Sequence, residues 1–147
     1  MKISKQEYSE LTKKASKPSP KFKDFAFAYI VGGLICVIGQ LFKEFYISLD
    51  LSEDVVSMLV PVSLIFIAAL LTGLDLFEKI AKRAGAGTLV PITGFANAVV
   101  SPAIEYKTEG WVLGLGANIF KIAGPVIAYG TIASIIYGLV YWTIGLF

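Results

Sequence analysis

The sequence predicts an all-α integral membrane protein with about four transmembrane helices and short broken or re-entrant helices between the second and the last span. Three observations support this fold class: an apolar excess, few charges and long uncharged runs. Of the 147 residues, 56% are hydrophobic and 16% are charged, against about 25% charged in typical soluble domains. A soluble domain of this length has too much surface to hide so many apolar side chains. The excess must therefore face lipid or another apolar partner.

The N-terminal segment, residues 1–24, is polar and holds seven of the 13 basic residues. Apolar residues on one face predict a short amphipathic helix over residues 4–16, lying on the cytoplasmic surface of the membrane. Pro18 and Pro20 are expected to end this helix, because proline lacks the backbone donor and clashes with the preceding turn. A disordered tail is the alternative interpretation.

Two long apolar runs predict the first two spans. Residues 25–42 would form a helix of about 27 Å, close to the ~30 Å thickness of a bilayer core. Residues 55–77 form the second span, with Asp75 as its single charge near the end. Basic residues precede the first span and follow the second, and the loop between them is acidic. Because lysine and arginine stay on the cytoplasmic side, the N-terminus is predicted to be cytoplasmic.

Glycine and proline interrupt the apolar sequence beyond residue 84. Residues 89–104 would form a short third span and residues 111–123 a shorter helix, while the uncharged residues 126–147 form the last span. Non-helical backbone persists at membrane depth only where protein buries it or a watery cavity accepts it, so interrupted segments point to a permeation or binding site. The predicted hinges of these broken helices are Gly94, Pro102, Gly124 and Pro125.

Two topologies remain open for this region. If residues 84–104 cross the membrane, the chain crosses four times, its C-terminus is cytoplasmic and the polar link at residues 105–110 faces external water. If the two short pieces form one re-entrant hairpin, the chain crosses three times, Phe147 is external and the link lies within the membrane. We favour the first topology, because three charges near the midplane are costly without a pore.

Five polar residues in the interrupted region are candidates for lining a solute path: Asn97, Ser101, Glu105, Asn118 and Lys121. The two amides, Asn97 and Asn118, either bond to a permeant or join neighbouring helices. A lysine at mid-helix costs at least ~2.5 kcal/mol, so Lys121 is expected to face a cavity or a partner. The alternative is that its side chain reaches the interface.

Carboxylates elsewhere have simpler interpretations. Glu105 and Glu109 would form a cation-selective ring if the protein oligomerises, or else belong to a solvated loop. Asp75 and Glu78 are expected to form ordinary i,i+4 ion pairs with the lysines that follow them.

Several classes of protein are excluded. The chain has no histidine, which excludes His-ligated zinc sites and His-based triads. One cysteine, Cys36, cannot form an internal disulfide or a cysteine cluster. A net charge of +2 is too small to bind nucleic acid through charge alone. Because no nucleophile–base pair, phosphate loop or metal cluster occurs, we expect no enzyme activity, catalytic residue, metal or cofactor.

Three function classes fit these features. The first is a channel subunit that passes a small solute down its gradient. The second is a non-conducting scaffold that anchors other subunits of a transport complex, in which the broken segments serve packing. The third is a secondary transporter, which usually carries inverted repeats and a coupling-ion site at the midplane.

Three stretches of the chain resemble the sporulation stage V A (SpoVA) family of membrane proteins: GGLICVIGQL (32–41), GFANAVVSPAIEYKTEG (94–110) and GLGANIFKIAGPVIAYG (114–130). The resemblance covers about residues 17–145. The N-terminal extension, with its lysines and prolines, favours the family's AC members over the shorter AE members. The family motifs map onto Asn97, Glu105, Gly110, Asn118, Lys121, Gly124 and Pro125.

The resemblance implies a channel component of the spore inner membrane. Such proteins help to move dipicolinic acid, as its calcium chelate, into the developing spore and out again at germination, with opening under membrane tension. The implied partners are membrane lipid, the AE relative and the soluble AD protein, in an oligomer. The resemblance supplies no catalytic residues.

Overall fold

The computed structural model describes residues 5–15 and 21–145, and no strand occurs in these ranges. The predicted all-α membrane fold is confirmed. In chain order the elements are α1 (Lys5–Ala15), α2 (Lys21–Ile47), α3 (Glu53–Gly73), α4 (Phe77–Ala84), α5 (Ala86–Leu89), α6 (Ile92–Glu105), the 3-10 turn η1 (Lys107–Glu109), the π-helix η2 (Trp111–Gly116) and α7 (Ala117–Ile144).

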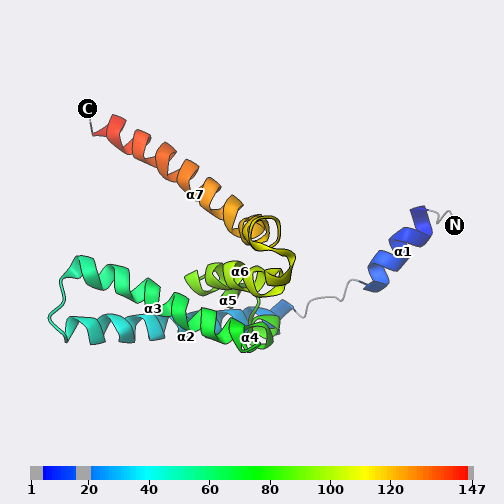
Figure 1. Ribbon diagram of the computed structural model, residues 1–147, viewed down its shortest axis with the longest axis horizontal. Helices are drawn as coiled ribbons and strands as arrows, with labels where there is room; N and C mark the ends of the chain where they lie inside the picture. The colour runs from blue at the N-terminus through cyan, green and yellow to red at the C-terminus, as the bar shows by residue number, and fades with distance from the viewer. Residues whose placement is uncertain (1–4, 16–20, 146–147) are drawn as a thin grey trace.

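Three stretches of the described chain are long and apolar enough to cross a membrane: Phe22–Ile47, Glu53–Gly73 and Trp111–Ile144. The first two contain most of the predicted spans at 25–42 and 55–77. They lie side by side as an antiparallel pair (Figure 1). The Tyr46 hydroxyl of α2 and the Ser63 hydroxyl of α3 share a 2.6 Å hydrogen bond across the pair.

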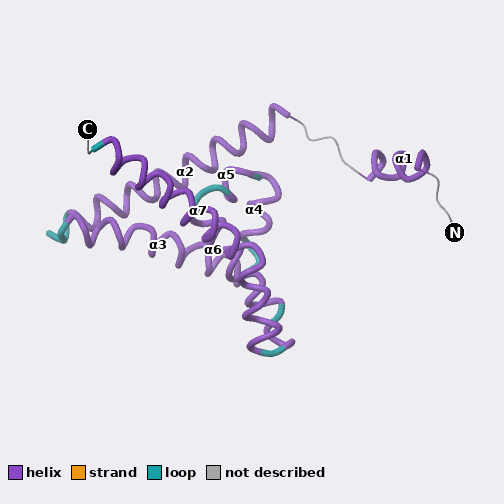
Figure 2. Tube along the Cα trace, turned by 90° about the horizontal axis from the view of Figure 1, so that it is seen from above, coloured by secondary structure: helices purple, strands orange, loops and turns teal. Residues whose placement is uncertain are grey.

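The predicted N-terminal helix is present as α1, which lies apart from the other helices in both views (Figures 1 and 2). Pro18 and Pro20, the expected helix terminators, lie outside the described residues. The position of α1 on the membrane surface stays a prediction.

Helix α3 ends four residues before the predicted boundary, and Asp75 is the reason. The Asp75 backbone has φ of 55°, a left-handed conformation that Asp adopts more readily than most residues. The Leu76 amide then donates to the Leu71 carbonyl at 2.9 Å and the Asp75 amide to the Thr72 carbonyl at 3.1 Å. This pair of bonds is a Schellman motif. It turns the chain into α4 and places the Asp75 carboxylate at the end of α3.

A close backbone contact joins α5 to α2. A Cβ on Gly87 would overlap the Ala28 carbonyl oxygen, so only glycine permits this approach. The small core lies nearby, where Ala68, Phe77 and Ala96 of three different helices are buried together. The short helices α4 and α5 are thereby held against the α2–α3 pair.

The predicted third span differs from the structure in length and in the position of its break. Helix α6 has 14 residues and is about 21 Å long, shorter than the predicted 89–104 segment. The chain breaks at Val90–Pro91, where Pro91 precedes the helix in an extended conformation. The expected breaks at Gly94 and Pro102 are absent, because α6 runs through both. Proline removes only one backbone bond, and the packed neighbours of α6 hold the helix together.

The expected interruption at Gly124–Pro125 is also absent. Residues 111–123 and the predicted last span join into one continuous helical stretch, η2 followed by α7. Both views show α7 changing direction along its length (Figures 1 and 2). Pro125 lies inside α7, and an internal proline bends a helix by removing a bond and crowding the preceding turn. The segment is therefore bent rather than broken.

Helix α6 and the start of α7 form a hairpin, with the polar turn η1 at its tip. From Pro125 to Ile144, in contrast, every residue of α7 is exposed, and this part extends away from the other helices in Figure 1. The membrane-spanning end of α7 therefore buries no residue against the rest of the described chain.

Candidate functional site

A polar cleft of about 250 Å³ opens where α3 ends and α6 passes beside it. Three of the five candidate path residues line it together: Asn97, Ser101 and Glu105. They occur at intervals of four residues along α6, which places them on one face of the helix. The cleft is completed by residues from α3, from the turn after it and from α4, and by one further residue of α6: Thr72, Asp75, Glu78, Ala81 and Ile104.

Thr72 joins the two principal helices of the polar cleft. Thr72 is 9% exposed, and its hydroxyl lies 2.7 Å from the Ala68 carbonyl and 3.0 Å from Asn97 Oδ1. A threonine hydroxyl has a single proton, so it donates to one of these acceptors at a time. The Asn97 amide therefore keeps hydrogen-bonding capacity for a further group.

Charge in the polar cleft is predominantly negative. Of the two predicted i,i+4 ion pairs, the one between Lys82 Nζ and Glu78 Oε1 is present at 2.7 Å. No ion pair joins Asp75 and Lys79, two residues that the structure describes, because Asp75 lies in a left-handed turn before α4 begins. Lys82 donates a hydrogen bond to the Glu78 carboxylate and attracts its charge, which lowers the pKa of that carboxyl below its usual value. Asp75 and Glu105 add two more carboxylates to the lining. Acidic linings of this kind favour cations and disfavour free anions.

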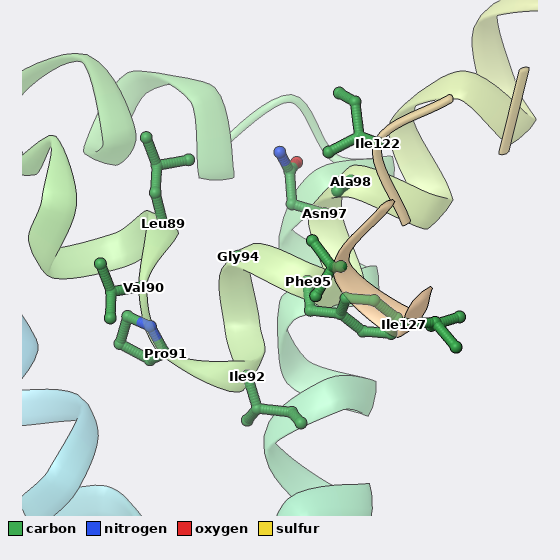
Figure 3. A pocket seen from close by; sticks show the side chains of 11 residues that line it. Leu89, Val90, Pro91, Ile92, Gly94, Phe95, Asn97, Ala98, Ile122 and Ile127 are labelled. Atoms are coloured by element: carbon green, nitrogen blue, oxygen red, sulfur yellow. The ribbon is translucent and has the colours of Figure 1, made fainter. Parts of the chain in front are cut away.

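A second cavity, the apolar groove, lies between the α5–α6 break and α7 and has a volume of about 710 Å³. Figure 3 shows Leu89 on one side of it, Ile122 on the other, and the Asn97 amide between them. Asn97 lines the apolar groove and the polar cleft alike. It is therefore the residue at which an apolar and a polar environment meet.

The other two candidates lie away from both cavities. Asn118 is 4% exposed, and its Nδ2 donates to the Gly114 carbonyl at 2.6 Å. Within the described part of the chain, Asn118 Oδ1 has no hydrogen-bond partner. The Lys121 ammonium lies 5.6 Å from the centre of the Tyr106 ring, a cation–π contact between α7 and the hairpin turn. Asn118 and Lys121 are thus separate from the three candidates that line the polar cleft.

The sequence interpretation missed Thr72 and understated Asp75. Thr72 looks like an ordinary small residue near the end of an apolar run, and no local pattern connects it with Asn97. Asp75 could have indicated the end of α3, because helices commonly end at a residue in the left-handed conformation. In the described ranges, no group of three or more His, Cys, Asp or Glu residues is arranged to hold a metal ion.

These elements define an all-α membrane protein with a polar cleft beside a broken helix. The SpoVAC/SpoVAEB sporulation membrane protein family matches residues 24–140. Stage V sporulation protein AC of Bacillus subtilis (strain 168) is 44% identical over 137 residues, which are 92% of this chain and 91% of the relative. No solved structure matches the chain. The chain belongs to the SpoVAC/SpoVAEB family of sporulation membrane proteins, and the resemblance seen in its motifs is confirmed.

Proposed function

We propose that this chain is a channel subunit through which dipicolinic acid, as its calcium chelate, crosses the spore inner membrane in sporulation and germination. The main support for this proposal is that Asn97, Ser101 and Glu105 line the polar cleft together with Thr72. These residues come from two helices that are far apart in sequence, and the cleft adjoins a broken helix. Such places are where membrane proteins bind and pass polar solutes.

The charge of the polar cleft bears on which species passes. Dipicolinate alone is a dianion, and the carboxylates of Asp75 and Glu105 would repel it. Its calcium chelate is near neutral, and calcium takes carboxylate and amide oxygens as ligands. The lining therefore favours the chelate over the free dianion.

Gating and assembly belong to the same proposal. The bend in α7 and the Val90–Pro91 break are places where helices can shift when the membrane area expands, which supports opening under tension. The proposed partners are the AE relative and the soluble AD protein, with the N-terminus on the cytoplasmic side.

The alternative is a non-conducting scaffold, and the exposed end of α7 favours it. A Cβ on Gly130 or Gly138 would meet no atom within 4 Å. Small residues on an unpartnered membrane helix permit close approach of another helix. Such a surface would anchor other subunits whether or not this chain conducts.

Release of calcium dipicolinate from liposomes containing the purified protein separates these functions. A channel is expected to release the solute faster than protein-free liposomes do, without dependence on proton or sodium gradients. Release that requires such a gradient would indicate a secondary transporter. If correctly inserted protein gives no release, with or without osmotic swelling, the scaffold function replaces the channel.

A further inference from the structure

We propose that the apolar groove binds one acyl chain of a membrane phospholipid. The groove has a volume of about 710 Å³, within the range of ~300–1,000 Å³ typical of small-molecule sites. None of its lining residues is charged, and Asn97 is the single one with a polar side chain. Sites of this composition bind apolar ligands and use the few polar groups to orient them.

The apolar groove is continuous with the surface that faces lipid. Ile122, Val126 and Ile127 of its lining belong to the membrane-spanning stretch Trp111–Ile144. On the opposite side Val90 is 82% exposed, and Figure 3 shows it beside Pro91 at the α5–α6 break. The solvent beside a membrane-spanning surface is hydrocarbon. Acyl chains are therefore the molecules that meet this groove in the bilayer.

The protein cannot close the apolar groove from the side of α5 and α6. A Cβ on Gly94 would overlap the Leu89 carbonyl oxygen, which shows how tightly α6 packs on the break. Gly87 holds α5 against α2 by an equally close backbone contact. The wall formed by α7 is less constrained, because Ile122, Val126 and Ile127 are 57%, 54% and 50% exposed. An unfilled groove forfeits the dispersion contacts of its lining, so a ligand that fills it stabilises this arrangement.

Occupancy of the apolar groove is coupled to the polar cleft through Asn97, which lines both. A bound acyl chain keeps Ile122 and Val126 away from the α5–α6 break, and its departure lets α7 approach Asn97. A ligand shifts such an equilibrium by its differential affinity for the two arrangements. This consequence for solute passage rests on the proposed function, whereas lipid binding itself does not.

Fluorescence quenching by a phospholipid with brominated acyl chains tests the binding. The reporter is Phe95→Trp, since Phe95 lines the groove, in a full chain carrying Trp111→Phe and Trp142→Phe. The matched control is Ile135→Trp, which is exposed on α7 outside the groove. In detergent with limiting brominated lipid, we expect the Phe95→Trp signal to be quenched at a lipid concentration about tenfold lower than the control. Ala98→Phe, which fills the groove, should abolish this difference.

Three results would overturn the proposal. Parallel quenching of the two reporters would mean that the groove meets only the general lipid shell. An unquenched Phe95→Trp in a protein whose mass is that of a dimer would mean that a second copy of the chain covers the groove. High-affinity quenching that persists in a folded Ala98→Phe variant would place the lipid elsewhere. If Ala98→Phe does not fold, the quenching of Phe95→Trp relative to Ile135→Trp alone decides whether the groove binds lipid.

Discussion

Asn97 lies at the boundary of two cavities and also bonds to a neighbouring helix. It lines the polar cleft and the apolar groove, and its Oδ1 lies 3.0 Å from the Thr72 hydroxyl of α3. An amide between membrane helices stabilises their packing by only ~0.6–1.7 kcal/mol. If Asn97 has only a structural role, its replacement should lower the stability of the protein slightly. If it takes part in solute passage, its replacement should lower the rate of release.

Replacement of Asn97 by leucine keeps most of the side-chain volume and removes both polar atoms. We expect Asn97→Leu to reduce calcium dipicolinate release from liposomes about tenfold, equivalent to about 1.4 kcal/mol added to the barrier. Asn97→Gln keeps the amide and should retain most of the release. Equal release by the leucine variant and the unmodified protein would remove Asn97 from the path.

Lys121 poses a different question, because its ammonium contacts the Tyr106 ring and lies outside both cavities. A cation–π contact at an exposed position contributes ~0.5–1 kcal/mol. Lys121→Met should therefore slow dipicolinate release by a few-fold, through loosening of the hairpin between α6 and α7. Lys121→Arg keeps the positive charge and should behave as the unmodified protein. Spores whose uptake and release are unchanged by Lys121→Met would show that the lysine has no part in the mechanism.

At the scale of elements, the sequence predicts the helices that depend on local interactions, but not the cleft that depends on contacts between helices. The apolar run at 25–42, and the run at 55–77 as far as Gly73, form helices because a membrane segment must satisfy its own backbone. The polar cleft depends instead on α3 lying beside α6, a tertiary contact that has no signature along the chain. At Pro125 the local pattern predicted a break that the structure lacks. One lost backbone bond bends a helix but is too little to end it when the flanking residues continue the helix.

The contact between α2 and α5 offers a direct test of the packing. Gly87→Ala would place a Cβ against the Ala28 carbonyl oxygen, and overpacking of this kind costs ~1–3 kcal/mol. We expect a lower melting temperature in detergent. Gly33→Ala on α2 is the matched control, because its Cβ would meet no atom within 4 Å. Identical melting temperatures for the two variants would contradict the close packing of α5 on α2.

At the scale of the whole molecule, the chain divides into a packed body and an unpartnered span. The α2–α3 pair holds α4, α5 and α6, while no residue of α7 from Pro125 onward is buried. Composition predicted the membrane fold but not this division. Burial within one chain depends on which apolar surfaces pack on one another and which face lipid or a neighbour, and hydrophobicity alone does not distinguish them.

The side of the membrane that carries the hairpin turn decides between the two predicted topologies. Lys107 lies in this turn, in η1, and is exposed. In a Cys36→Ser background, Lys107→Cys should react with a membrane-impermeant thiol reagent applied from the external side. This result is expected for four crossings, since charged residues at the midplane are costly. A cysteine that reacts from neither side would instead indicate a re-entrant hairpin.

Access of water to the polar cleft is the central claim, and two serines test it. Ser101 lines the cleft, whereas Ser134 is exposed on α7, within the stretch Trp111–Ile144 that is long and apolar enough to cross the membrane. In a Cys36→Ser background in liposomes, we expect a small charged thiol reagent to modify Ser101→Cys quickly and Ser134→Cys slowly. Calcium dipicolinate should protect Ser101→Cys, and modification should stop release of the solute. If Ser101→Cys reacts no faster than Ser134→Cys and gains no protection, the polar cleft is not the path.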